Sequence, residues 1–157
     1  MFKVQTQEPP ERFFEDFAEG QQMPAVTKGP MQVGHQVRWA GACDNYASEF
    51  HHDAGVARSQ GLPGVLLSGP FIACCMLTEV THWLGRRARV LSFWDRNSGP
   101  TKPHDMAHIS ATVKRTWVED GKGFVEIDCQ IRNQDQQVTT PGGVIAEMPL
   151  QRERGVT

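Results

Sequence analysis

The residues best suited to acid–base chemistry gather in one short segment and comprise Asp44, Glu49, His51, His52 and Asp53. A histidine beside a carboxylate can remove a proton from one atom and deliver a proton to another, which is the basis of general acid–base catalysis. This segment is therefore the first candidate for an active site.

A second feature follows a short way along the chain. Gly61, Pro63 and Gly64 interrupt the sequence, and Gly69-Pro70 then opens a strongly apolar helix, with Gly69 predicted as the N-cap and Pro70 as the first helical residue. The first amides of a helix have no partner within it, so they can bind an anion or polarise a carbonyl oxygen. An acid–base pair beside such a helix start suits proton transfer next to a carbonyl group.

Three helices are predicted to position these groups, over residues 35–47, 53–60 and about 69–84. Asp53 is a natural N-cap for the second helix, and Gly61 ends it. The third helix carries apolar residues at steps of three and four, which predicts burial on most sides, with both Cys74 and Cys75 as core residues. Those apolar residues are Phe71, Ile72, Cys75, Met76, Val80, Trp83 and Leu84.

After Gly85 the apolar residues recur at every second position. This period predicts strands, over residues 88–94, 107–117, 124–131 and 138–148. Asp120-Gly121 marks a tight turn between the second and third of them, and residues 20–34 leave room for one further strand at most.

These elements predict a single α+β domain over residues 13–150, in which an antiparallel sheet wraps the long helix. A loose N-terminal arm over residues 1–12 and a polar tail over residues 151–157 flank it.

Composition excludes several classes of protein. The 157 residues carry 16 Lys and Arg against 18 Asp and Glu, so a net charge of -2 gives no basic face for nucleic acid. No apolar stretch reaches the roughly 18 residues of a membrane span, and the N-terminal residues lack the layout of a secretory signal. With no spacing typical of zinc sites, the four cysteines are expected to be free thiols in a cytoplasmic protein.

Four segments, in order, resemble one known family: FEDFAEGQQMP, QVRWAGAC, HHDAGVARSQGLPGVLLSGPF and NQDQQVTTPGGVIAEMP. The chain resembles the MaoC-like hot-dog hydratases, also called (R)-specific enoyl-CoA hydratases or hydratase type 2. The resemblance covers most of the chain and implies a hot-dog fold, with the sheet wrapped around a central helix.

The resemblance also implies an activity, the reversible hydration of a trans-2-enoyl thioester to a 3-hydroxyacyl thioester. The substrate is carried on coenzyme A or acyl carrier protein, and neither a cofactor nor a metal takes part. The implied assembly is a homodimer or larger, or a heterodimer with a related chain. In this family an Asp and a His hold a water, and a glycine N–H stabilises the enolate oxygen.

Matched position by position, the resemblance makes His51 the catalytic histidine and Gly69 the oxyanion donor. Ser68 replaces the histidine that usually precedes this glycine, and Tyr46 stands five residues before His51, where the family has its aspartate. Both are assigned to substrate binding.

The family pattern D-x-N-P-x-H is absent, which leaves the carboxylate open. Asp44, seven residues before His51, can take the role if its loop is longer; Glu49 is a second candidate, and an incomplete site is the third possibility.

Two other functions stay open. In the first, the chain is a non-catalytic or half-catalytic subunit of a hetero-oligomeric hydratase, in fatty-acid or steroid side-chain metabolism. In the second, it is a hot-dog acyl-CoA thioesterase with Glu79 as its helix carboxylate, although Glu79 lies at least two turns past the helix start.

Overall fold

The computed structural model describes residues 8–44 and 48–151. Its framework is a five-stranded antiparallel sheet in the order β1-β3-β4-β5-β2. The strands are β1 (Val26–Lys28), β2 (Arg89–Asp95), β3 (Ala107–Glu119), β4 (Lys122–Arg132) and β5 (Val138–Met148). The short β1 and the longer β2 form the two edges.

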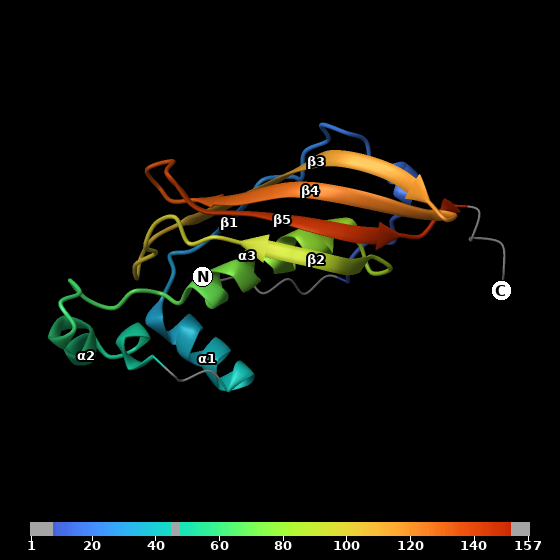
Figure 1. Ribbon diagram of the computed structural model, residues 1–157. Coiled ribbons are helices and arrows are strands. Elements are labelled where there is room, and N and C mark those ends of the chain that lie inside the picture. The colour runs from blue at the N-terminus through green and yellow to red at the C-terminus, as the bar shows by residue number, and fades with distance from the viewer. Residues whose placement is uncertain (1–7, 45–47, 152–157) are drawn as a thin grey trace.

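One long helix lies along one face of this sheet (Figure 1). This helix is α3 (Gly69–Leu84), and two shorter helices, α1 (Val33–Cys43) and α2 (Ala54–Ser59), lie beside its N-terminal end. Two 3₁₀ turns, η1 (Phe14–Asp16) and η2 (Glu49–His51), complete the set of described helices. The predicted α+β class and the wrapping of the long helix are both confirmed.

The start of α3 differs from the prediction by one residue. Ser68, and not Gly69, is the N-cap, because the Ser68 carbonyl already accepts the Ile72 N–H at 3.1 Å. Gly69 is therefore the first helical residue. Pro70 follows in the first turn, where its missing N–H costs no helical hydrogen bond.

The first helix also ends earlier than predicted. Asp44 adopts the left-handed conformation, with φ of 51°, and its N–H donates to the Ala40 carbonyl. Aspartate tolerates this conformation better than most residues do, so Asp44 ends α1; the remaining residues of the predicted helix, 45–47, lie outside the described residues. By contrast, Asp53 caps α2 as predicted, accepting the Gly55 and Val56 N–H groups.

The strand predictions are confirmed with small shifts in their ends, and the predicted fourth strand matches β5 in full. Asp120 and Gly121 join β3 to β4 with positive φ angles of 48° and 76°. Two consecutive positive φ angles are typical of the type I′ turns that suit twisted hairpins.

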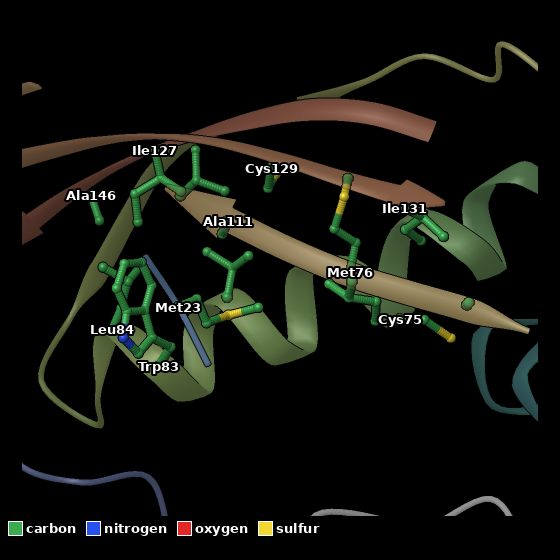
Figure 2. Packing of buried hydrophobic residues seen from close by; sticks show 14 of the residues in the cluster. Met23, Cys75, Met76, Trp83, Leu84, Ala111, Ile127, Cys129, Ile131 and Ala146 are labelled. Carbon is green, nitrogen blue, oxygen red and sulfur yellow. The ribbon is translucent and has the colours of Figure 1, made fainter. Parts of the chain in front are cut away.

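The core lies between α3 and the facing side of the sheet (Figure 2). The helix contributes its predicted apolar residues, and β3 and β4 contribute alternate residues such as Ile109 and Ile127. Cys75 and Cys129 are buried free thiols, as predicted. The prediction for Cys74 was wrong, because it shares the exposed side of α3 with Pro70 and Thr78.

The N-terminal residues that the structure describes pack against the far end of α3. Arg12 donates to the Trp83 carbonyl at 3.0 Å, and the Pro10 carbonyl accepts the Arg86 N–H. Phe13 and Phe17 are buried, as expected of an apolar lead-in. Within the described part of the chain, no helix is long and apolar enough to cross a membrane.

Candidate active site

A pocket of about 380 Å³ opens at the N-terminal end of α3. Three segments meet there. They are the η2 turn, the chain that leads into the first turn of α3, and the loop that follows β2. The lining residues are Phe50, His51, Leu66, Leu67, Gly69, Ile72, Asn97, Ser98, Gly99, Pro100 and Thr101. Two of the residues predicted for the site, His51 and Gly69, therefore line one cavity.

His51 is held in one tautomer by the chain that leads into α3. Its Nδ1 lies 2.7 Å from the Leu66 carbonyl oxygen. A carbonyl only accepts, so Nδ1 carries the proton of the neutral ring and Nε2 keeps its lone pair. Nε2 has no hydrogen-bond partner among the described residues. The ring also packs on Phe50, with centroids 4.1 Å apart. This arrangement leaves a fixed imidazole with one nitrogen ready to take a proton.

Gln36 connects the two parts of the site, and sequence reasoning did not identify it. Its side chain is 3% exposed on α1. Its Nε2 donates to the His51 carbonyl at 2.7 Å, and its Oε1 accepts the Ser68 N–H at 2.5 Å. A single buried amide therefore fixes both the turn that carries His51 and the residue before Gly69.

Gly69 places a backbone donor at the pocket wall. It is the first residue of α3, where N–H groups have no helical partner, and its N–H makes no hydrogen bond to another described residue. Ser68 is buried beside it, is not one of the lining residues and makes no side-chain cap bond. The role predicted for Ser68 in substrate binding stays a prediction.

No carboxylate lines the pocket among the residues that the structure describes. Asp44 is exposed at the end of α1, and Glu49 is exposed on η2, directly before Phe50 and His51. Tyr46 lies outside the described residues. Asp53 acts as a cap, and hydrogen bonds from the Val56 and Gly55 N–H groups lower the pKa of its carboxyl.

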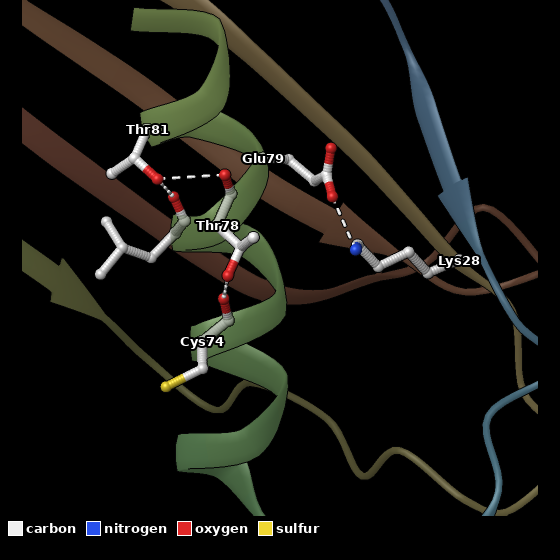
Figure 3. Close-up of polar contacts among 6 residues, drawn as sticks. Lys28, Cys74, Thr78, Glu79 and Thr81 are labelled. Carbon is white, nitrogen blue, oxygen red and sulfur yellow. Dashed lines mark hydrogen bonds and ion pairs between the residues drawn. The ribbon is translucent and has the colours of Figure 1, made fainter. Parts of the chain in front are cut away.

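The carboxylate of α3 is engaged elsewhere. Glu79 is 3% exposed, and its Oε1 lies 2.6 Å from Lys28 Nζ of β1 (Figure 3). It lines a separate pocket of about 510 Å³ near Trp83 and does not line the His51 pocket. A thioesterase of this kind needs its carboxylate near the start of α3. The position of Glu79 therefore gives no support to that function.

The residues that the structure describes also offer no metal centre. No group of three or more His, Cys, Asp or Glu side chains is placed among them to hold a metal ion. The described lining of the His51 pocket offers an imidazole, the N-terminal end of α3, the Asn97 carboxamide and the hydroxyls of Ser98 and Thr101.

The sequence matches no protein-family model and no curated protein. Solved structures do share its fold. The R-hydratase PhaJ1 from Pseudomonas aeruginosa is 16% identical, with a TM-score of 0.77 and coverage of 88% of this chain and 86% of that chain. A MaoC-like dehydratase from Rhodospirillum rubrum is 19% identical, with a TM-score of 0.75 and coverage of 89% and 98% respectively.

A third structure is the ChsH1–ChsH2 complex from Mycobacterium tuberculosis. One chain of that complex is 22% identical, with a TM-score of 0.72, and the match covers 83% of this chain and 98% of that chain. At these identities the likeness establishes the fold. The chain has the hot-dog fold of the MaoC-like dehydratases and R-hydratases, which confirms the fold expected from the sequence.

Proposed function

We propose that this protein is a lyase that reversibly hydrates a trans-2-enoyl thioester to a 3-hydroxyacyl thioester. The observation that carries the proposal is the pocket shared by His51, with an uncommitted Nε2, and the free N–H of Gly69. The fold shared with R-hydratases and MaoC-like dehydratases supports the same reaction class.

In this reaction His51 Nε2 takes a proton from water while the water oxygen bonds to the β-carbon of the enoyl thioester. The electron pair of the double bond moves toward the thioester oxygen, which becomes an enolate stabilised by the Gly69 N–H. A second acid then protonates the α-carbon, and the thioester carbonyl is restored. No electron is gained or lost overall, so the reaction needs no redox cofactor.

Besides His51, the reaction needs an acid that protonates the α-carbon. We assign this role to Asp44, which ends α1 and stands seven residues before His51 in the sequence. Asp44→Asn tests the assignment: if Asp44 supplies the proton, turnover falls by roughly 10²–10⁴, the usual scale for an acid–base group. Unchanged turnover would leave Glu49, or a carboxylate from another chain, as the source.

The experiment for the whole proposal is a hydration assay on the purified chain alone. Crotonyl-CoA and a longer enoyl-CoA are supplied, and loss of the enoyl thioester absorbance is followed. Activity with either substrate supports the proposal. No activity from a folded protein on either substrate contradicts the proposal that this chain is catalytic by itself.

A second candidate function is a subunit that needs a partner chain. Two observations favour it: no described carboxylate lines the pocket, and one similar structure is the two-component ChsH1–ChsH2 complex. In that case an inactive preparation gains activity when a related chain is added. A fully active homo-oligomer would exclude it.

A further inference from the structure

A carboxamide lies directly over the start of α3. Asn97 belongs to the loop after β2, and its side chain occupies the space that a β-carbon on Gly69 would fill. Such a carbon would lie 1.8 Å from Asn97 Nδ2 and 2.6 Å from Asn97 Cγ. The contact requires glycine at position 69, because any other residue would displace the Asn97 side chain.

The loop that carries Asn97 is anchored on both sides. The Arg96 N–H donates to the Pro141 carbonyl at 3.0 Å, and the Ser98 N–H donates to the Thr139 carbonyl at 2.8 Å. Both acceptors belong to β5, a strand in the middle of the sheet. The Asn97 backbone is thus held between two anchored peptide groups, while the residue itself is exposed at the mouth of the pocket.

The Asn97 carboxamide is chemically uncommitted. It makes no hydrogen bond to another described residue, yet it lines the same pocket as His51 and Gly69. Of its two polar atoms, Nδ2 lies nearer to the position of a β-carbon on Gly69. Oδ1 lies 2.8 Å from that position. The Asn97 amino group therefore lies beside the first residue of α3, and both residues line the same pocket.

We propose that Asn97 is the second oxyanion donor, which hydrogen-bonds to the thioester oxygen together with the Gly69 N–H. The inference rests on the proposed function, since it needs a substrate whose carbonyl oxygen becomes negative. An oxyanion is best stabilised by preorganised donors aimed at one point, and the anchored loop holds the Asn97 backbone beside the start of α3.

Two variants remove the donor: Asn97→Ala adds no charge and is the decisive one, and Asn97→Asp keeps the shape of the side chain but introduces a negative charge. Loss of one oxyanion donor lowers kcat by roughly 10²–10³, and the added negative charge makes the loss at neutral pH at least as large as in Asn97→Ala. Lowering the pH protonates the new carboxyl and returns a donor, so the activity of Asn97→Asp relative to the wild type rises. Gln22→Glu makes the same chemical change at an exposed position and keeps wild-type kcat.

A purely steric role gives a different result. If Asn97 only packs on Gly69, the uncharged variant Asn97→Ala keeps kcat within a few-fold of the wild type, which overturns the inference. The contact itself is tested by stability: Gly69→Ala lowers the urea midpoint, and the double variant Gly69→Ala/Asn97→Ala recovers it. Failure of the double variant to recover would show that Asn97 does not occupy that space.

A binding measurement separates this inference from the proposed function. Acetoacetyl-CoA forms an enolate with its own absorbance, and two oxyanion donors favour that form when it binds. Suppose that the wild type binds this enolate but does not hydrate enoyl-CoA, and that Asn97→Asp loses enolate binding. That result sustains the role of Asn97 and contradicts the proposed hydratase activity. Suppose instead that the wild type hydrates enoyl-CoA and that Asn97→Asp binds the enolate as tightly as the wild type does. That result sustains the hydratase activity and overturns the role of Asn97.

Discussion

At the scale of single residues, the site depends on side chains that fix His51 without carrying out chemistry. The Leu66 carbonyl sets which nitrogen of His51 bears the proton, and Gln36 holds the His51 carbonyl and the Ser68 N–H together. The orientation of the imidazole relative to Gly69 is therefore built from hydrogen bonds that join three separate segments.

Replacing Gln36 should loosen this arrangement. Gln36→Leu leaves the His51 carbonyl and the Ser68 N–H without this partner, and each buried polar group left unsatisfied costs about 1–3 kcal/mol. We expect a lower free energy of unfolding in urea and a fall in kcat larger than the rise in KM. Arg38→Leu, on the exposed side of the same helix, should change neither. Equal kcat in Gln36→Leu and the wild type would show that Gln36 does not position His51.

The cysteines should divide into two reactive and two inert thiols. Burial raises the pKa of Cys75 to about 11 and that of Cys129 to about 12, so both stay protonated at neutral pH and only the thiolate reacts. Cys43 and Cys74 are exposed. Mass spectrometry after brief treatment with iodoacetamide should find label on the exposed pair alone, and on all four after unfolding in urea. Early labelling of Cys129 would contradict the buried position.

The sequence allowed prediction of the site residues that belong to a recognisable pattern, namely His51 and Gly69. The types of residue pointed to the acid–base segment and to the helix start, the resemblance to the MaoC-like hydratases singled out His51 and Gly69, and both line one pocket. Gln36 and Asn97 were missed, because neutral amides have no characteristic spacing and their roles exist only after α1 and the loop after β2 meet α3.

At the scale of elements, one buried ion pair joins the edge strand β1 to α3. Lys28 and Glu79 are 2.6 Å apart, with side chains 10% and 2% exposed. Removing one partner of a buried pair typically costs about 3–5 kcal/mol, whereas apolar replacement of both is often neutral.

We therefore predict that Lys28→Met strongly lowers the free energy of unfolding and that Lys28→Met/Glu79→Leu restores most of it, both measured in urea. Lys114→Met is the matched control, because Lys114 pairs with Glu126 on an exposed part of the sheet. A Lys28→Met variant as stable as Lys114→Met would show that the pair contributes little.

The elements themselves were largely predictable. Apolar residues alternate with polar ones in β4 and recur at steps of three and four in α3, because each element buries one side. This periodicity is visible in the sequence itself. The ends of α1 were not predictable in the same way, because the chain stops the helix at Asp44 through a left-handed residue. A left-handed conformation at one aspartate leaves no mark in the periodicity of apolar residues, so the end of the helix could not be read from the sequence pattern.

At the scale of the whole molecule, the β2 edge of the sheet exposes two large apolar side chains. On β2, Leu91 is 43% exposed and Trp94 is 55% exposed, and the described part of the chain pairs this strand only with β5. Unpaired edges with apolar side chains readily accept a further strand. We propose that assembly with a second hot-dog chain uses this edge.

Light scattering after size exclusion tests this proposal. The wild type should have a mass at least twice that of one chain, and Leu91→Glu should shift it toward the monomer. Val118→Glu changes a residue that is 54% exposed near the β3–β4 turn, away from this edge, and should leave the mass unchanged. A monomeric wild type would contradict self-association and direct attention to an unlike partner chain.

The central claim is that His51 is the base of a hydration reaction. The measurement that tests it most directly compares enoyl-CoA hydration by the wild type, His51→Ala and His52→Ala, with folding of each checked by circular dichroism. His51→Ala should lose roughly 10²–10⁴ in kcat, while the neighbouring His52→Ala keeps most of its activity. An active, folded His51→Ala variant with a rate close to that of the wild type would contradict the account.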